Sequence, residues 1–388
     1  MTLPRSTTTH SAEPLAYEPQ DPPLRRWEAL ITASDNLYRQ YQSPTWWQHL
    51  VTSGMAEASN IATVYDGHGQ LLGVAPFRVG MHPLEFSIRG RALGRFSLRA
   101  VMPLGGAPLG STEPEVHDRI YAHMISRNPS VDCLYLHSVR VGSYAWSHIH
   151  TSDYVRRNFT VYLPRGVAPF HYLTLPESFE EYLQRQFRKK KRYNLHRQLR
   201  LLGNAHGDLQ CERVDSEEQV PTLQAAASLV TSRAWQRALA SPGMYDVLGS
   251  PDRLRDLARR RLLRAYVLMC GTTPRAVVLG YQFAGVYHYA EIAHDATVAQ
   301  FSPGSTLLYL LIKDLIEHDR PRHVNFGIGD AEYKRVFGNT TIHDASVILF
   351  RKTPVNRGRH LLHSVFRRAL RLTKRYRARL RPDGPTEP

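Results

Sequence analysis

The chain contains 388 residues, 42% of which are hydrophobic, and carries a formal net charge of +16 at pH 7. This length exceeds one ordinary core, so we expect a globular protein of two domains, each with its own apolar centre. No apolar run approaches the roughly 20 residues of a membrane-spanning helix, and residues 1–25 lack the apolar stretch of a signal peptide. We therefore expect a cytoplasmic protein.

The positive charge is concentrated near the C-terminus. Twelve Lys and Arg residues and no Asp or Glu lie in residues 351–381, whereas residues 1–350 hold 38 basic and 32 acidic residues, a net charge of +6. A body that is only mildly basic does not favour nucleic-acid binding by the whole protein, and we expect no DNA partner. Cys133, Cys211 and Cys270 are odd in number and far apart, which predicts neither a disulfide framework nor a zinc site.

The N-terminal half begins with a segment that is too polar to fold. Residues 1–25 contain five prolines among Ser, Thr and acidic residues, which predicts a disordered leader. Ser43 and Pro44 are typical of a helix cap and a first helical position. We then expect strands at 61–65 and 71–78 joined by a turn at 66–69, a helix at 113–127 and a strand at 133–138. These elements indicate a mixed α/β unit over residues 26–165.

The C-terminal half opens with helices. Ser178 and Glu181 have the spacing of a capping box, at the start of one helix that we expect to run to Gly203. Further helices are expected at 220–238 and 252–263.

An antiparallel meander and a mixed segment follow these helices. The expected elements are strands at 265–270, 276–283 and 286–293, a helix at 306–318, a strand at 323–328, a short helix at 331–337 and a strand at 345–351. Strands that lead into a helix and then a further strand predict a mixed sheet with helical cover, in a unit of residues 166–352. The predicted fold class is therefore α/β of the mixed, α+β type, followed by a basic amphipathic or disordered tail at 353–388.

The turn before the helix at 306–318 has the composition of an anion site. It contains Ser302, Gly304, Ser305 and Thr306 between an expected strand and an expected helix. The first turn of a helix offers unpaired N–H groups and positive potential, a glycine lets backbone approach closely, and the hydroxyls add donors. These features predict a pyrophosphate seat, although an ordinary helix cap has the same composition.

A second segment combines glycine with ionisable groups. Asp330 follows two glycines at a strand end, as the expected cap of a short helix that presents Tyr333 and Lys334. A carboxylate beside a phenol and an ammonium can deprotonate a nucleophile and stabilise an oxyanion. The structural alternative is a plain N-cap followed by a solvated lysine.

Taken together, these features resemble a known family. A meander, Ser-Pro-Gly at 302–304 opening an amphipathic helix, and a strand ending in Phe-Gly-x-Gly-Asp at 326–330 with Tyr-Lys after it resemble the GNAT-fold acyltransferase domain of CelD-like proteins, which are related to Fem-type aminoacyl transferases. The run at 175–183, Trp46 and Trp47, and the segment 69–77 are also similar to that family. The resemblance covers about residues 40–350. It implies two tandem GNAT-like domains, each a mixed twisted sheet with helices on its faces.

The resemblance also implies an activity and roles for residues. The expected reaction is transfer of an acyl group from acyl-CoA, a cosubstrate rather than a permanently bound cofactor, to an amine or hydroxyl, such as a polysaccharide or cell-envelope precursor. The turn at 302–306 would hold the donor phosphates, and the strand at 287–292, which includes Tyr289, would pair with the pantetheine arm. The implied base is Glu291 or Asp330, with His294 as an alternative, and Lys334 would hold a phosphate or an oxyanion.

Two further functions stay open. The glycine-rich turn that is more usual in GNAT enzymes is absent, and Fem-type relatives use aminoacyl-tRNA as donor. A non-catalytic protein that binds RNA or membranes is the alternative from another class. The basic run at 185–193 fits an RNA backbone or the CoA 3′-phosphate, or a solvated helix face. The basic tail is amphipathic enough for peripheral contact with an anionic membrane.

Overall fold

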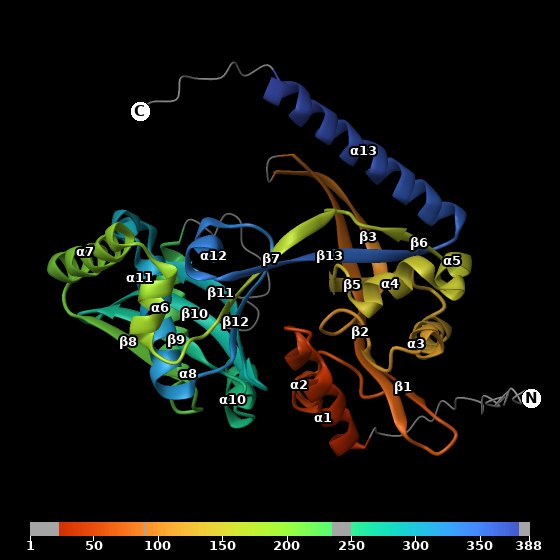
Figure 1. Cartoon of the computed structure of the whole chain (residues 1–388), viewed down its shortest axis with the longest axis horizontal. Helices are drawn as coiled ribbons and strands as arrows, with labels where there is room; N and C mark the ends of the chain where they lie inside the picture. Colours follow the sequence, from red (N-terminus) through yellow and green to blue (C-terminus); the bar gives the residue numbers. More distant parts are fainter. Residues whose placement is uncertain (1–22, 89–90, 235–249, 380–388) are drawn as a thin grey trace, which may run out of the picture.

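The computed structural model describes residues 23–88, 91–234 and 250–379, and it is a mixed α/β structure built on one large sheet (Figure 1). The strand order along this sheet is β1-β2-β3-β5-β13-β7-β12-β11-β10-β9-β8, with β4 paired to β2 and β6 paired to β13. Both parallel and antiparallel pairs occur, and helices lie over the sheet. The predicted mixed fold class is confirmed.

The N-terminal half supplies one end of the sheet and the helices around it. Its elements are α1 (Leu24–Ala33), η1 (Arg39–Gln42), α2 (Pro44–Thr52), β1 (Ile61–Tyr65), β2 (Leu71–Ile88), β3 (Arg91–Pro103), β4 (Leu109–Gly110), α3 (Pro114–Arg127), β5 (Cys133–Arg140), α4 (Tyr144–Thr151), α5 (Asp153–Asn158) and β6 (Phe159–Tyr162). The Ser43 hydroxyl accepts a hydrogen bond from the Trp46 N–H, which confirms the predicted cap. Helix α1 begins at Leu24, inside the predicted leader, because Trp27 and Ile31 are buried in an apolar cluster; residues 1–22 lie outside the described residues.

The C-terminal half supplies the other end. Its elements are β7 (Val167–Thr174), α6 (Phe179–Gln186), α7 (Lys189–His206), β8 (Leu209–Val214), α8 (Val220–Ser232), α10 (Pro251–Arg259), β9 (Ala265–Cys270), β10 (Thr273–Phe283), β11 (Val286–His294), η3 (Ala296–Phe301), α11 (Pro303–Asp314), η4 (Leu315–Asp319), β12 (His323–Ile328), α12 (Glu332–Phe337), β13 (Thr340–Arg351) and α13 (Pro354–Arg379). The meander β9-β10-β11 is antiparallel, as predicted. The last residues of the predicted helix 220–238 lie outside the described residues.

The predicted single helix at 178–203 is wrong, because the chain forms two helices there. Phe187 and Arg188 have extended backbone angles that separate α6 from α7. The Phe187 ring is buried between the rings of Tyr182 and Phe337, with centroid distances of 5.6 and 5.7 Å. A straight helix would not place this ring in that apolar contact, so burial outweighs local helical propensity.

Strand β13 connects the two halves. Its N-terminal part pairs antiparallel with β7, and its C-terminal part pairs antiparallel with β5 and β6. Figure 1 shows β13 running through the middle of the molecule toward the strands of the N-terminal half. The two halves therefore share a continuous sheet.

Helices cover both faces of the C-terminal part of the sheet. Helices α6, α7 and α11 bury one face in an apolar cluster around Tyr287, Leu307 and Phe337. Helices α8 and α10 cover the opposite face, where Trp46 and Leu50 of α2 join them. The N-terminal helix α2 thus packs on the C-terminal half, next to β10 and β11.

Candidate active site

The sheet opens between β11 and β12. These strands pair in parallel only at their first residues, Val286 with His323, Tyr287 with Val324 and His288 with Asn325. Strand β11 continues to His294, and in the described part of the chain no strand pairs with it on that side beyond His288. The later N–H and C=O groups of β11 that point away from β10 form a short free edge, to which an extended ligand can add hydrogen bonds as another strand would.

At this opening, a β-bulge changes the direction in which the side chains of β11 point. Leu279 of β10 pairs with Glu291, whereas the next residue, Gly280, pairs with Tyr289, so Ala290 is the extra residue. A bulge bends its strand and changes which side chains share a face. Here it places Glu291 on the face of Leu279, the face that α2 and α8 cover.

Aromatic rings from three elements meet at the opening. The Tyr289 ring lies 5.8 Å from Phe326 of β12 and 5.7 Å from Tyr333 of α12, measured between centroids. Burial raises the pKa of Tyr333 to about 12, and the nearby Glu291 charge adds to the effect. The structure therefore brings together Tyr289, Glu291 and Tyr333 from the predicted site, and Tyr333 stays protonated at neutral pH.

Glu291 has the environment of a proton acceptor. Its side chain is half-buried, and burial raises its pKa above the usual value for a glutamate. Burial raises the pKa values of the half-buried Tyr41 and the buried Tyr281 on the same face, and the Glu291 charge adds to this effect. A carboxylate with a raised pKa is suited to general base chemistry near neutral pH.

The predicted anion seat lies at the start of α11, where it meets the end of β11. Ser302 has left-handed backbone angles, φ 55° and ψ 52°, which turn the chain sharply into the helix at Pro303. A Cβ added at Gly304 would lie 3.3 Å from Ile292 Cδ1 and 3.5 Å from His294 Nδ1. The start of the helix thus abuts the last residues of the open strand.

The hydroxyl groups of this turn differ in how accessible they are to a ligand. Ser302 is the N-cap residue, but its hydroxyl makes no hydrogen bond to the first turn and instead lies 3.4 Å from Gln198 Nε2 of α7. Ser305 is half-buried, whereas the Thr306 side chain is 3% exposed and faces the core. Ser302, Gly304 and Ser305 can therefore reach a ligand at the surface, and Thr306 supports the helix from inside.

Asp330 is not the expected N-cap of the short helix, and Lys334 is not a solvated helix residue. The N-cap of α12 is Ala331, and the half-exposed Asp330 carboxylate pairs with Arg335 and lies 3.4 Å from His171 Nε2. Lys334 is buried rather than solvated, and its Nζ donates to the carbonyls of Gly327 at 3.2 Å and Ile328 at 3.0 Å. Burial lowers its pKa to about 8. Lys334 therefore fastens α12 to the end of β12.

An aromatic pocket lies on the same face of the sheet as Glu291, opposite to the face that carries Tyr289. Its volume is 380 Å³, and it lies between the two halves. Its lining includes the side chains of Tyr38, Tyr41, Trp46, Arg78, Met102, Tyr135, Leu257 and Tyr281. Trp46 packs edge-on against Tyr41 and Tyr281, with centroid distances of 4.7 and 5.0 Å, and Tyr41 lies 5.4 Å from His288 of β11.

The sequence did not reveal this pocket. The sequence links Trp46 to a run that resembles the GNAT-like family, and this resemblance does not connect it with a cavity. The aromatic residues at 38, 41 and 46 in one short segment are the local signal for an aromatic pocket. Their contact with Tyr281 joins residues more than 200 positions apart, which a local pattern does not predict.

Comparisons with known proteins agree with this geometry. A family model described as an acetyltransferase (GNAT) domain matches residues 189–335, from α7 to α12. No curated protein sequence matches the chain.

Similar structures have low sequence identity. The crystal structure of FemX has a TM-score of 0.53 at 10% identity, and the match covers 88% of this chain and 98% of that one. A conserved protein of unknown function from Bacteroides thetaiotaomicron has a TM-score of 0.52 at 8% identity, covering 87% of this chain and 100% of the other. The chain therefore has a fold similar to that of FemX, and its residues 189–335 match the model of the GNAT acetyltransferase domain.

Proposed function

We propose that the chain is an acyltransferase that takes an acyl group from acyl-CoA. Two features carry this proposal: β11 separates from β12 after His288, and the last residues of β11 lie against the start of α11. The free edge of β11 suits the amide groups of the pantetheine arm, and the N–H groups at the start of α11 suit the pyrophosphate. The pantetheine arm and the pyrophosphate of one CoA molecule would therefore bind at adjacent places.

The reaction is transfer to an amine or hydroxyl acceptor. Glu291 removes a proton from the acceptor, whose nitrogen or oxygen attacks the thioester carbonyl. A new C–N or C–O bond forms, the C–S bond breaks, and Tyr333 gives its proton to the departing sulfur. Tyr333 has this proton available because its pKa is about 12. Asp330 is a weaker base candidate because its carboxylate is already paired with Arg335.

The aromatic pocket is the proposed acceptor space. Tyr41 and Tyr281 in its wall lie near Glu291, and the exposed Arg78 is at its margin. In the described part of the chain Arg78 has no ion-pair partner. An acceptor bound there would reach Glu291 from the face opposite to Tyr289. A polysaccharide or cell-envelope precursor is the acceptor that we propose for this pocket.

Thermal-shift measurements with acetyl-CoA, longer acyl-CoAs and free CoA test the donor assignment. A ligand that binds the folded state raises its melting temperature, by an amount that corresponds to about 2.7 kcal/mol at 100 times the dissociation constant. We expect a clear rise for the wild type and none for Gly304→Glu, whose carboxylate would occupy the start of α11. Gly358→Glu is the matched control, because nothing lies within 4 Å of a Cβ at that position. An equal rise in Gly304→Glu would remove this turn from the donor site.

Aminoacyl-tRNA is the alternative donor, and one feature favours it. The exposed lysines 189–191 begin helix α7, which packs against α11 and η3 near the proposed site. A basic helix beside the donor turn can hold a nucleic-acid backbone. If the melting temperature rises with tRNA at low salt and not with any CoA thioester, the donor would be aminoacyl-tRNA and the acyl-CoA proposal would be wrong.

Helix α13 is the proposed membrane contact. Its first half is anchored by Arg359, which pairs with Asp132, and by His363, which is hydrogen-bonded to Tyr162 at 2.5 Å and to the Glu85 carbonyl at 3.0 Å. Leu361, Leu362, Val365 and Leu372 remain exposed. Such a helix, with exposed arginines beside leucines, suits an anionic lipid surface. Among the described residues, no helix is both long and apolar enough to cross a bilayer.

A further inference from the structure

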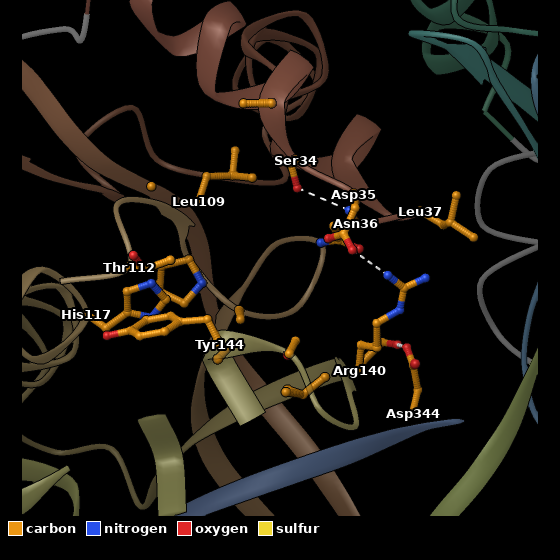
Figure 2. Close-up of a pocket in the computed structure, with 18 of the residues that line it drawn as sticks. Ser34, Asp35, Asn36, Leu37, Leu109, Thr112, His117, Arg140, Tyr144 and Asp344 are labelled. Carbon is orange, nitrogen blue, oxygen red and sulfur yellow. Dashed lines mark hydrogen bonds and ion pairs between the residues drawn. The ribbon is translucent and has the colours of Figure 1, made fainter. Parts of the chain in front are cut away.

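A second cavity, of 310 Å³, lies in the N-terminal half, away from the proposed active site (Figure 2). It is enclosed by the end of α1, the segment 34–37, the loop around β4, the start of α4, and strands β5, β7 and β13. Its volume is at the lower end of the range of about 300–1,000 Å³ that small-molecule sites have. Figure 2 shows Asp35, Asn36, Arg140 and Asp344 toward one end, and Thr112, His117 and Tyr144 toward the other.

Buried polar atoms in its wall lack partners. Asp344 is 5% exposed; its Oδ2 accepts a hydrogen bond from the Ser138 hydroxyl, and its Oδ1 has no partner. His117 is 2% exposed and its Nδ1 has no partner, and the same is true of the Tyr144 hydroxyl. Buried polar groups usually have a hydrogen-bond partner, so three unpartnered ones around one cavity point to a ligand that would bond to them.

The charges of the cavity define the kind of ligand. Burial raises the pKa of Asp344, and Arg140, which is ion-paired with Asp35, already places a positive charge near this carboxyl group, so a second cation is disfavoured. The two carboxylates disfavour an anion. His117 is neutral, because burial lowers its pKa to about 3. The cavity therefore requires uncharged groups that can donate to Asp344 and bond to His117 and Tyr144.

The rest of the wall is apolar. It is formed by Leu30, Leu37, Leu109, Val139, Phe170 and Ile342. A carbon ring that carries hydroxyl groups has an apolar face and hydrogen-bond donors at its edge. It therefore matches a cavity with both apolar and polar walls.

The segment 34–42 separates the cavity from the aromatic pocket. Leu37 lines the cavity, whereas Tyr38 lines the aromatic pocket. The Leu37 carbonyl accepts a hydrogen bond of 2.9 Å from the buried Asn325 Nδ2 of β12, which fixes the segment on the sheet. The cavity is therefore a separate site.

From these contacts we infer that the cavity binds a small uncharged polyol of about monosaccharide size, with one hydroxyl donated to Asp344 Oδ1 and others bonded to His117 and Tyr144. This site does not depend on the transfer reaction. It would bind its ligand whether or not the chain uses acyl-CoA.

Titration calorimetry without any acyl donor tests this inference. The probes are glucose, galactose, mannose and N-acetylglucosamine, with glucose 6-phosphate and glucosamine as charged counterparts. We expect at least one uncharged sugar to bind in the millimolar range or better, and its charged counterpart to bind at least tenfold more weakly. If none of the uncharged sugars binds to the wild type, or if the charged ones bind equally well, the inference is overturned.

Two variants locate the site. Ala33→Trp fills the cavity from an exposed position, and Ala205→Trp, at an exposed position of α7, is its control. We expect Ala33→Trp to abolish binding and Ala205→Trp to leave it unchanged. Asp344→Asn, which keeps the size of the side chain, should weaken binding at least tenfold. Wild-type affinity in both Ala33→Trp and Asp344→Asn, with circular dichroism showing folded proteins, would place the sugar elsewhere and contradict the inference.

Discussion

At the scale of single residues, Glu291 is the side chain on which the proposed chemistry depends. Burial raises its pKa, so it keeps its proton to a higher pH than an ordinary glutamate does. A general base must be deprotonated, so activity should be lost as the pH falls through this raised pKa.

Glu291→Gln removes the base and keeps the shape of the side chain. We expect kcat to fall by a factor of about 10²–10⁴, the usual contribution of general base catalysis, and the acid limb of the pH profile to disappear. Binding of acetyl-CoA should be unchanged. Asp330→Asn is the comparison, and a larger loss of kcat in Asp330→Asn than in Glu291→Gln would reverse the assignment of the base.

Lys334 allows a prediction about stability. Its pKa is about 8 in the folded protein against 10.5 ordinarily, so the unfolded state binds more protons between these two values. Stability therefore rises with pH across this window, because the cost of burying the charged ammonium disappears. Urea unfolding of the wild type at pH 7.5 and pH 10 should show this increase relative to Lys334→Met.

Lys334→Met also removes donors from two carbonyls, so it should be less stable by about 1–3 kcal/mol at pH 10. Lys313→Met, at a half-exposed position of α11, is the control and should have almost no effect. A wild type whose stability relative to Lys334→Met is the same at both pH values would contradict the buried position of Lys334.

At the scale of elements, the bulge between β10 and β11 depends on Gly280. A Cβ at this position would lie 2.2 Å from Tyr287 Oη and 2.6 Å from the Arg264 carbonyl oxygen, which is too close for real atoms. Gly280→Ala should lower the free energy of unfolding by about 1–3 kcal/mol, the usual cost of overpacking. The same substitution at Gly94, where nothing lies within 4 Å, is the control. Equal stability of the two variants in urea would show that the strands do not approach each other as described.

Elements that depend on local sequence could be predicted. The Ser43 cap, the meander β9-β10-β11 and the strand at 323–328 follow from periodicity and turn residues, and the structure confirms them. The break at Phe187 could not be predicted, because it is caused by a ring contact with Phe337, 150 residues away. The extent of β13 was missed for the same reason, since its early residues pair with β7.

In the candidate site, too, the parts formed by neighbouring residues could be predicted and the parts formed by distant segments could not. The turn at 302–304 and the strand with Tyr289 and Glu291 are adjacent in sequence, so a local pattern was enough to mark them. The aromatic pocket, the burial of Lys334 and the cavity around Asp344 are formed by distant segments. No local pattern encodes these contacts.

At the scale of the whole molecule, α13 extends from the body beside the β2–β3 hairpin (Figure 1). Exposed leucines and arginines on it predict binding to vesicles that contain phosphatidylserine and weaker binding to phosphatidylcholine alone. Arg368→Glu with Arg371→Glu should reduce this binding at least tenfold, because each lost basic residue near the surface contributes about 1 kcal/mol. Arg253→Glu with Arg255→Glu, on α10, is the control pair. Equal binding to both kinds of vesicle in a sedimentation assay would exclude an electrostatic membrane contact.

The proposed function requires that the free edge of β11 and the start of α11 hold the acyl donor. Hydrogen–deuterium exchange of peptides covering 286–294 and 303–308, with and without acetyl-CoA, tests it most directly. We expect slower amide exchange in both peptides when acetyl-CoA is bound, and no change in the β1–β2 hairpin at 61–78. Binding of acetyl-CoA that protects other segments and leaves these two peptides unchanged would contradict it.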